Sequence, residues 1–67
     1  MNVTRRVGAN LRRAREDLGI SQEELADRAG LHRTYVSGVE RGVRNPTVLV
    51  LEKIAKALKV KSSTLLE

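Results

Sequence analysis

Three of the five glycines and the single proline limit the fold more than any other feature, because they divide the chain into short segments. Gly19, Gly30 and Gly42 each follow a stretch with helical spacing of apolar residues, and glycine favours the end of a helix. Pro46 marks a loop, since the residue before a proline disfavours helical backbone. No segment alternates apolar and polar residues as a strand would. The sequence therefore predicts an all-α fold with five helices, in a single domain over residues 1–67.

The first predicted helix ends at about Leu18, just before the first of these glycines. Its apolar residues recur at spacings of three and four, which places them in one stripe on the helix surface. The stripe consists of Val3, Val7, Leu11, Ala14 and Leu18.

Two shorter helices follow. Ser21 and Glu24 have the spacing of a capping box, which predicts the start of the second helix, and Gly30 ends it. The third helix is predicted from about Arg33 to Arg41. Two short helices joined by a glycine-containing turn form a helix-turn-helix unit, whose second helix can enter a DNA major groove about 12 Å wide.

The helix-turn-helix unit covers about residues 21–41. A helical wheel separates two faces of the third helix. Val36 and Val39 are expected to face inward. The residues expected on or near the outward face are Thr34, Ser37, Gly38 and Arg41.

The last two predicted helices lie within residues 47–67 and are expected to supply both core and dimer interface. Thr47 is the predicted N-cap of the fourth helix, and the fifth begins at Ser62 or Ser63. The core face of the fourth helix consists of Leu51, Ile54, Ala55 and Leu58. A chain this short buries only about 60% of its unfolded surface, which favours a partner subunit. The apolar residues that remain for a homodimer interface are Leu49, Val50, Ala57, Leu65 and Leu66.

The charge balance points to an anionic partner. The formal net charge of +5 favours a nucleic acid or an anionic membrane surface. No apolar run approaches the roughly 18 residues of a membrane span, and the first residues lack the apolar block of a signal peptide. We therefore expect a soluble, cytoplasmic protein that binds nucleic acid and no membrane.

The residues that carry chemistry are sparse. The chain has no cysteine and one histidine, which excludes disulfides and argues against a structural zinc site. Ser21, Asp27 and His32 include the residue types of a catalytic triad, but no nucleophile elbow or phosphate loop accompanies them. We expect no enzymatic activity, no cofactor, no metal and no small-molecule ligand.

The segment around the predicted turn matches a known pattern, carried by Gln22–Ala26, Ala29–Leu31, Arg33–Ser37, Glu40–Gly42, Asn45 and Pro46. With these residues the chain resembles the Cro/repressor-type (XRE-like) helix-turn-helix family from about residue 7 to residue 66. Within that family, the string from His32 to Arg41, with Arg44 and Asn45, is most similar to controller proteins of bacterial restriction–modification systems. The resemblance implies a lambda-repressor-like five-helix bundle, with the helix-turn-helix formed by the second and third helices. It also implies a bacterial or phage-encoded, nucleoid-associated regulator that binds a palindromic operator in double-stranded DNA as a homodimer.

The resemblance also assigns roles to matching residues. Gln22 is implied to contact a phosphate and to steady the third helix. Arg15 and Glu40 match a family pair that bridges the first and third helices. Together with the outward position of Ser37, the resemblance predicts DNA contacts by Arg33, Thr34, Tyr35, Ser37, Arg44 and Asn45. Arg33 suits guanine, because its planar fork can donate to both O6 and N7.

One outward position departs from the family pattern. Gly38 stands where several phage-type relatives carry a long polar side chain that reads bases. Glycine inside a helix costs about 1 kcal/mol relative to alanine. We expect the glycine to provide room, either for the helix to lie deeper in the groove or for Arg33 and Tyr35 to swing across it.

Two other interpretations remain open. The chain could be an antitoxin or adaptor module, in which the same apolar C-terminal surface binds a protein partner. It could also be the DNA-binding fragment of a longer regulator.

Overall fold

The computed structural model describes residues 2–67. These residues form five α-helices, and no strand occurs among them. The helices are α1 (Val3–Leu18), α2 (Gln22–Ala29), α3 (Arg33–Glu40), α4 (Val48–Leu58) and α5 (Ser62–Leu66). The predicted all-α fold of five helices is confirmed. No helix within residues 2–67 has both the length and the apolar character needed to cross a bilayer.

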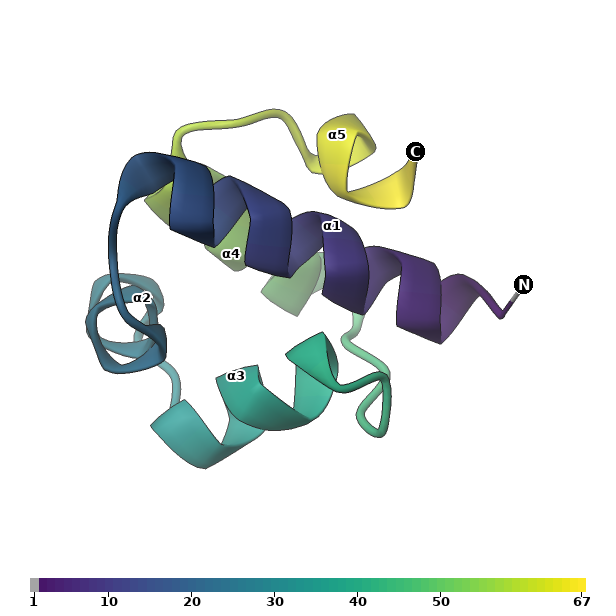
Figure 1. Cartoon of the computed structure of the whole chain (residues 1–67), viewed down its shortest axis with the longest axis horizontal. Coiled ribbons are helices and arrows are strands. Elements are labelled where there is room, and N and C mark those ends of the chain that lie inside the picture. Colours follow the sequence, from purple (N-terminus) through teal and green to yellow (C-terminus); the bar gives the residue numbers. More distant parts are fainter. Residues whose placement is uncertain (1) are drawn as a thin grey trace.

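The long helix α1 crosses the molecule, with α4 behind it and α5 alongside (Figure 1). The short helices α2 and α3 lie on the other side of α1 from α5, joined by a tight turn. This arrangement leaves α3 at the edge of the molecule, with one side against α1 and α2.

Short polar side chains begin two of the helices where the sequence predicts it. The Ser21 hydroxyl accepts a hydrogen bond from the Glu24 amide at 3.0 Å, and Thr47 accepts one from the Val50 amide at 3.2 Å. The reciprocal half of the predicted capping box is replaced by another contact. Arg28 Nε donates to the Glu24 carboxylate at 2.8 Å, so that carboxylate forms an ion pair one turn further along α2.

Two glycines with left-handed backbone lie just after the two helices of the helix-turn-helix segment. Gly30 has φ 70° and ends α2 as predicted. The third helix ends one residue earlier than predicted, because Arg41 is its C-cap and Gly42, with φ 77°, makes the turn beyond it.

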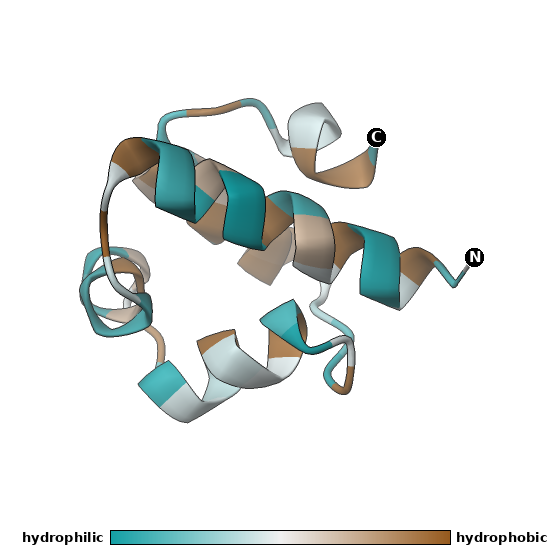
Figure 2. Cartoon of the chain, viewed as in Figure 1, coloured by the Kyte–Doolittle hydropathy of each residue, from teal (hydrophilic) through white to brown (hydrophobic). Residues whose placement is uncertain are grey.

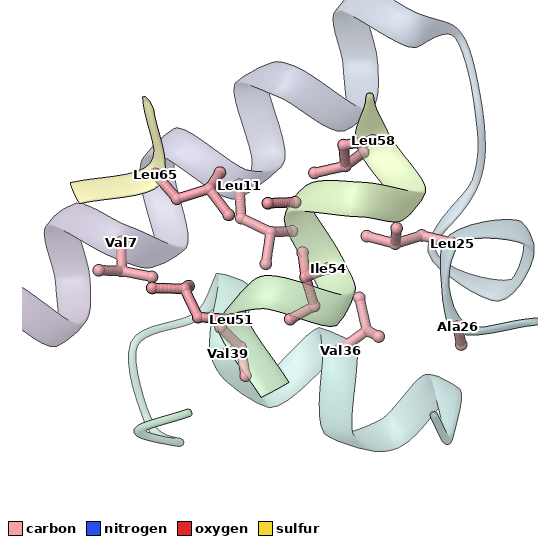
Figure 3. Packing of buried hydrophobic residues seen from close by; sticks show 11 residues of the cluster. Val7, Leu11, Leu25, Ala26, Val36, Val39, Leu51, Ile54, Leu58 and Leu65 are labelled. Carbon is pink, nitrogen blue, oxygen red and sulfur yellow. The ribbon is translucent and has the colours of Figure 1, made fainter. Parts of the chain in front are cut away.

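All five helices contribute to one apolar core (Figure 3). Its largest fully buried side chains are Leu11, Leu25, Ile54, Leu65, Val36 and Val39. Burying a side chain of this size stabilises the fold by about 1.5–3 kcal/mol. The apolar stripe of α1 is buried only in its middle, since Val3 is 54% exposed and Leu18 is 37% exposed.

The prediction that Leu65 supplies surface for a dimer is wrong. Helix α5 folds back onto α1 and turns Leu65 into the core, where its side chain is fully buried. Asn10 Nδ2 holds α5 in place by donating to the carbonyl oxygens of Leu65 and Glu67, at 3.1 and 2.9 Å. Leu66, the next residue, is 46% exposed.

Two further predicted interface residues, Val50 and Ala57, are half-buried and pack against the same core. Leu49 is 67% exposed. Of the five predicted residues, therefore, only Leu49 and Leu66 are exposed to solvent.

Candidate nucleic-acid interface

The turn between α2 and α3 brings the two helices into close contact. The Leu31 amide donates to the Ala26 carbonyl at 2.8 Å, and the small Ala26 side chain is buried between the helices. Val36 and Val39 are both fully buried and fix α3 to the core. In Figure 2, α3 is brown only in narrow bands, and the rest of its surface is hydrophilic or neutral.

Three of the predicted DNA-contacting residues lie together on the free face of α3. Arg33 and Thr34 are exposed in its first turn, and Ser37 is half-buried one turn further on. The three side chains line one shallow hollow. Tyr35 is placed differently, because it is half-buried and packs against the edge of the core.

A largely buried ion pair holds the C-terminal end of α3 against α1. Arg15 Nε donates to Glu40 Oε2 at 2.6 Å, and Arg15 Nη2 donates to Oε1 at 3.1 Å. The two side chains are only 12% and 4% exposed. Arg15 Nη1 also donates to the Ile20 carbonyl at 2.8 Å, so the guanidinium spans α1, the α1–α2 loop and α3. The pair that the resemblance implies is thus present.

The same carboxylate raises the pKa of Arg15 above its usual value. The hydrogen bonding that Arg15 donates to Glu40 is the main cause, and the charges of Glu40 and Glu16 add to it, whereas burial of the guanidinium acts in the opposite direction. Arg15 therefore stays positively charged and compensates the buried carboxylate.

Gln22 is the third member of this cluster. Its Nε2 donates to Glu40 Oε1 at 3.0 Å, so the first residue of α2 supports the last residue of α3. The implied steadying of the third helix is consistent with this bond, and the phosphate contact by Gln22 stays a prediction.

The sequence suggested that Gly38 leaves open room on α3, but the structure shows that this room is filled. Gly38 is buried, and a Cβ added to it would lie 2.5 Å from Cγ of Arg44. The amides of Val43 and Arg44 both donate to the Gly38 carbonyl, at 3.0 and 3.1 Å. The loop after α3 therefore folds back along the helix and lays the Arg44 side chain over the glycine.

Arg44 and Asn45 are both exposed, but they occupy different places. Asn45 lines an apolar hollow with Pro46 and Val48, away from the hollow of Arg33, Thr34 and Ser37. The predicted loop contact thus divides into Arg44, which lies against α3, and Asn45, which lies beside the start of α4.

Two residues that matter for this geometry, Gly8 and Arg5, were not identified from the sequence. A Cβ on Gly8 would lie 2.7 Å from the Glu40 carbonyl oxygen and would also meet the Val39 carbonyl oxygen, so α1 and α3 touch backbone to backbone. Arg5 packs on Gly42, with its Cγ 2.8 Å from the position of an added Cβ. A glycine inside the amphipathic first helix was the available signal for Gly8, since such a glycine indicates close packing.

Across residues 2–67, no three His, Cys, Asp or Glu side chains lie close enough together to share a metal ion. The free face of α3 carries one cationic and two hydroxyl-bearing side chains, those of Arg33, Thr34 and Ser37. Such groups bind phosphates and the edges of bases.

Comparison with known proteins gives the same picture. Residues 11–65 match the family model described as helix-turn-helix. The chain is 45% identical over 60 residues to the uncharacterized HTH-type transcriptional regulator y4dJ of Sinorhizobium fredii, covering 90% of this chain and 78% of that protein. It is 52% identical over 48 residues to the control protein C.BamHI of Bacillus amyloliquefaciens, covering 72% of this chain and 59% of that protein.

A solved structure is also closely similar. The restriction-modification controller protein C.AhdI from Aeromonas hydrophila superposes with a TM-score of 0.90 at 44% sequence identity. The superposition covers 92% of this chain and 94% of that one.

Proposed function

The chain belongs to the helix-turn-helix family of DNA-binding transcriptional regulators, and from this we propose that it binds a palindromic operator as a homodimer. Each copy would insert α3 into the major groove of one half-site, with the half-sites about 34 Å apart. The observation that carries the proposal is the free face of α3. Arg33 and Thr34 are exposed there, while the opposite face is fixed by buried valines.

Sequence would be read chiefly in the first turn of α3. Arg33 can donate twice to guanine, and the hydroxyl groups of Thr34 and Ser37 can contact bases or phosphates. Tyr35, on the flank of the helix, is suited to a phosphate or a thymine methyl. The net charge of +5 adds affinity that depends on salt and not on sequence.

The homodimer would use the exposed apolar residues of α4 and α5. Val48 and Leu49 are 78% and 67% exposed in the first turn of α4, and Leu66 is 46% exposed on α5. Two neighbouring hollows connect these residues, and Glu52 and Ser62 line both. A contiguous exposed apolar surface of this kind is typical of an interface between subunits.

A narrower proposal is that the chain is a restriction–modification controller acting in the bacterial cytoplasm. It is supported by the similarity to C.AhdI, which is described as a restriction-modification controller protein, and to the control protein C.BamHI. Other relatives, such as SinR of Bacillus subtilis, are HTH-type transcriptional regulators without it. An adjacent pair of methyltransferase and endonuclease genes would support the controller role, and a neighbourhood without them would assign the chain to the wider group.

Selection of bound duplexes from a random DNA library tests the DNA-binding proposal directly. We expect enrichment of one sequence with two-fold symmetry. Enrichment of a single, asymmetric half-site would contradict the dimer while leaving DNA binding intact. If no sequence is enriched over the starting library at any salt concentration, the result would contradict sequence-specific binding and favour a module that binds protein partners.

A further inference from the structure

A helical wheel places Gly38 away from the buried Val36 and Val39 of α3, yet Gly38 is buried too. The atoms that cover it belong to the aliphatic part of Arg44. Measured from the position of a Cβ on Gly38, Cγ, Cβ and Cδ of Arg44 lie at 2.5, 3.5 and 3.7 Å. A Cβ contact under 3 Å does not occur in real side chains, so any other residue at position 38 would displace the arginine.

We propose that Gly38 is a positioning residue for DNA recognition: it forms a seat on α3 that directs Arg44 toward the DNA beside the first-turn residues. The inference rests on the proposed DNA-binding function and adds a specificity determinant to it. Gly38 itself would touch no base.

The backbone supports this seat as well as the side chain. The Gly38 carbonyl accepts hydrogen bonds from the amides of both Val43 and Arg44, and Gly42 makes the turn between them with φ 77°. The start of the Arg44 side chain is thus held in one place relative to α3. Arginine has a flexible side chain, and ordering it before binding removes part of the entropy cost of contact with DNA.

An alternative role of Gly38, close approach of the α3 backbone to DNA, predicts a different effect of substituting it. If Gly38 served close approach of the helix backbone to DNA, a side chain there would weaken binding whatever residue stands at position 44. If it serves as the seat of Arg44, a side chain there would weaken binding only while Arg44 is present. A double-mutant cycle separates the two.

The cycle compares the parent, Gly38→Ala, Arg44→Ala and the double variant on the duplex selected by the parent. We expect each single substitution to weaken binding by about tenfold, the size of one base or phosphate contact. The double variant should bind no more weakly than Arg44→Ala alone. A double variant that binds about a hundredfold more weakly than the parent would overturn the proposal, since the losses would then be independent.

A measurement without DNA tests the seat itself. In the parent, nuclear Overhauser effects between the Gly38 Hα and Arg44 Hγ protons are expected, and in Gly38→Ala the Arg44 side-chain resonances should shift. Lack of these effects in the parent would overturn the proposal even if Gly38→Ala failed to fold. If the parent selects no duplex, the DNA-binding function and this proposal are overturned together. If the parent selects a duplex but the two single substitutions weaken binding independently, this proposal alone is overturned.

Discussion

The side chains around α3 divide into those that hold the helix and those that are free to meet a partner. Val36 and Val39 are fully buried, and the Glu40 side chain is 4% exposed. Arg33 and Thr34, which precede them in the same helix, are exposed. Single substitutions in the two groups should therefore affect different quantities, stability in the first and DNA affinity or specificity in the second.

Replacing Arg33 with alanine tests direct reading of a base. We expect Arg33→Ala to lose about 1–3 kcal/mol of discrimination at one base pair of each half-site, because a bidentate contact to guanine would be removed. The measurement is competition between the selected duplex and single-base variants.

Arg13→Ala is the matched control for Arg33→Ala. It removes the same charge from α1, where Arg13 lines a hollow with Leu58 and Val60. Its preference among bases should equal that of the parent. If Arg33→Ala also kept an unchanged preference, Arg33 would be a solvated arginine.

Replacing Glu40 with alanine tests the buried pair. We expect a loss of about 3–5 kcal/mol in the free energy of unfolding, because Arg15 would remain buried without a counter-charge. Glu16→Ala serves as the control, since its pair with Arg12 is 55–65% exposed. Exposed pairs of this kind contribute about 0–1 kcal/mol, so the two melts should differ clearly. Equal melts would contradict the structural role of the Arg15–Glu40 pair.

The pair should be insensitive to alkaline pH in the range where proteins are usually studied. The pKa of Arg15 is raised in the folded state, so its contribution is complete below the ordinary arginine pKa and is lost only as pH rises past the folded-state value. Thermal melts at pH 7 and pH 10 should therefore show the same difference between the parent and Glu40→Ala. A difference that vanished by pH 10 would contradict this.

At the scale of the elements, the crossing of α1 over the C-terminal end of α3 sets the position of α3. The two backbones meet at Gly8, the residue after the buried Val7. The ion pair of Arg15 and Glu40 lies two turns further along α1. The helix α3 is thus held to α1 at its C-terminal end, while Arg33 and Thr34 in its first turn are exposed.

Gly8→Ala tests this crossing. The added methyl group would meet backbone atoms of α3, and overpacking of this kind costs about 1–3 kcal/mol. Alanine gains about 1 kcal/mol of helix propensity over glycine, which offsets part of that cost. We expect a lower melting temperature and weaker operator binding.

Ala9→Gly measures the propensity difference in the same helix, at an exposed position. It should destabilise the protein by about 1 kcal/mol through propensity alone. A Gly8→Ala variant that melts higher than the parent would show that α1 and α3 can separate without cost.

At the scale of the whole molecule, the neighbours Leu65 and Leu66 have opposite roles. Leu65 belongs to the core, and Leu66 belongs to the exposed apolar surface with Val48 and Leu49. We expect Leu66→Asp and Leu49→Asp to give folded monomers with weakened operator binding. Leu65→Asp should instead unfold the chain, because it would bury an unpaired charge.

Sedimentation and thermal melting together distinguish these outcomes. Leu18→Asp, at the C-terminal end of α1, is the control for placing a charge on an exposed leucine, and it should remain a dimer. Intact dimers of both Leu49→Asp and Leu66→Asp would move the interface away from α4 and α5.

The sequence predicted best those features that depend on neighbouring residues. The caps at Ser21 and Thr47 and the stop at Gly30 are local, and all three are present in the structure. The face of α5 was not predictable, because a helix of five residues is too short to show a period, and contact with α1 decides which leucine is buried. The setting of Gly38 was missed because its neighbour Arg44 arrives by a turn that the helical wheel does not include.

The contact between position 38 and position 44 limits how such a protein can change its target. A long side chain at position 38 and an arginine seated over that position exclude each other, since both need the same space. A lineage that gains a new reader at position 38 must lose or redirect Arg44, and the intermediate with neither contact binds more weakly than both. Single substitutions would then not lead from one combination of residues to the other without a loss of binding. Positions 38 and 44 should therefore be randomised together in any attempt to redirect this protein to a new operator.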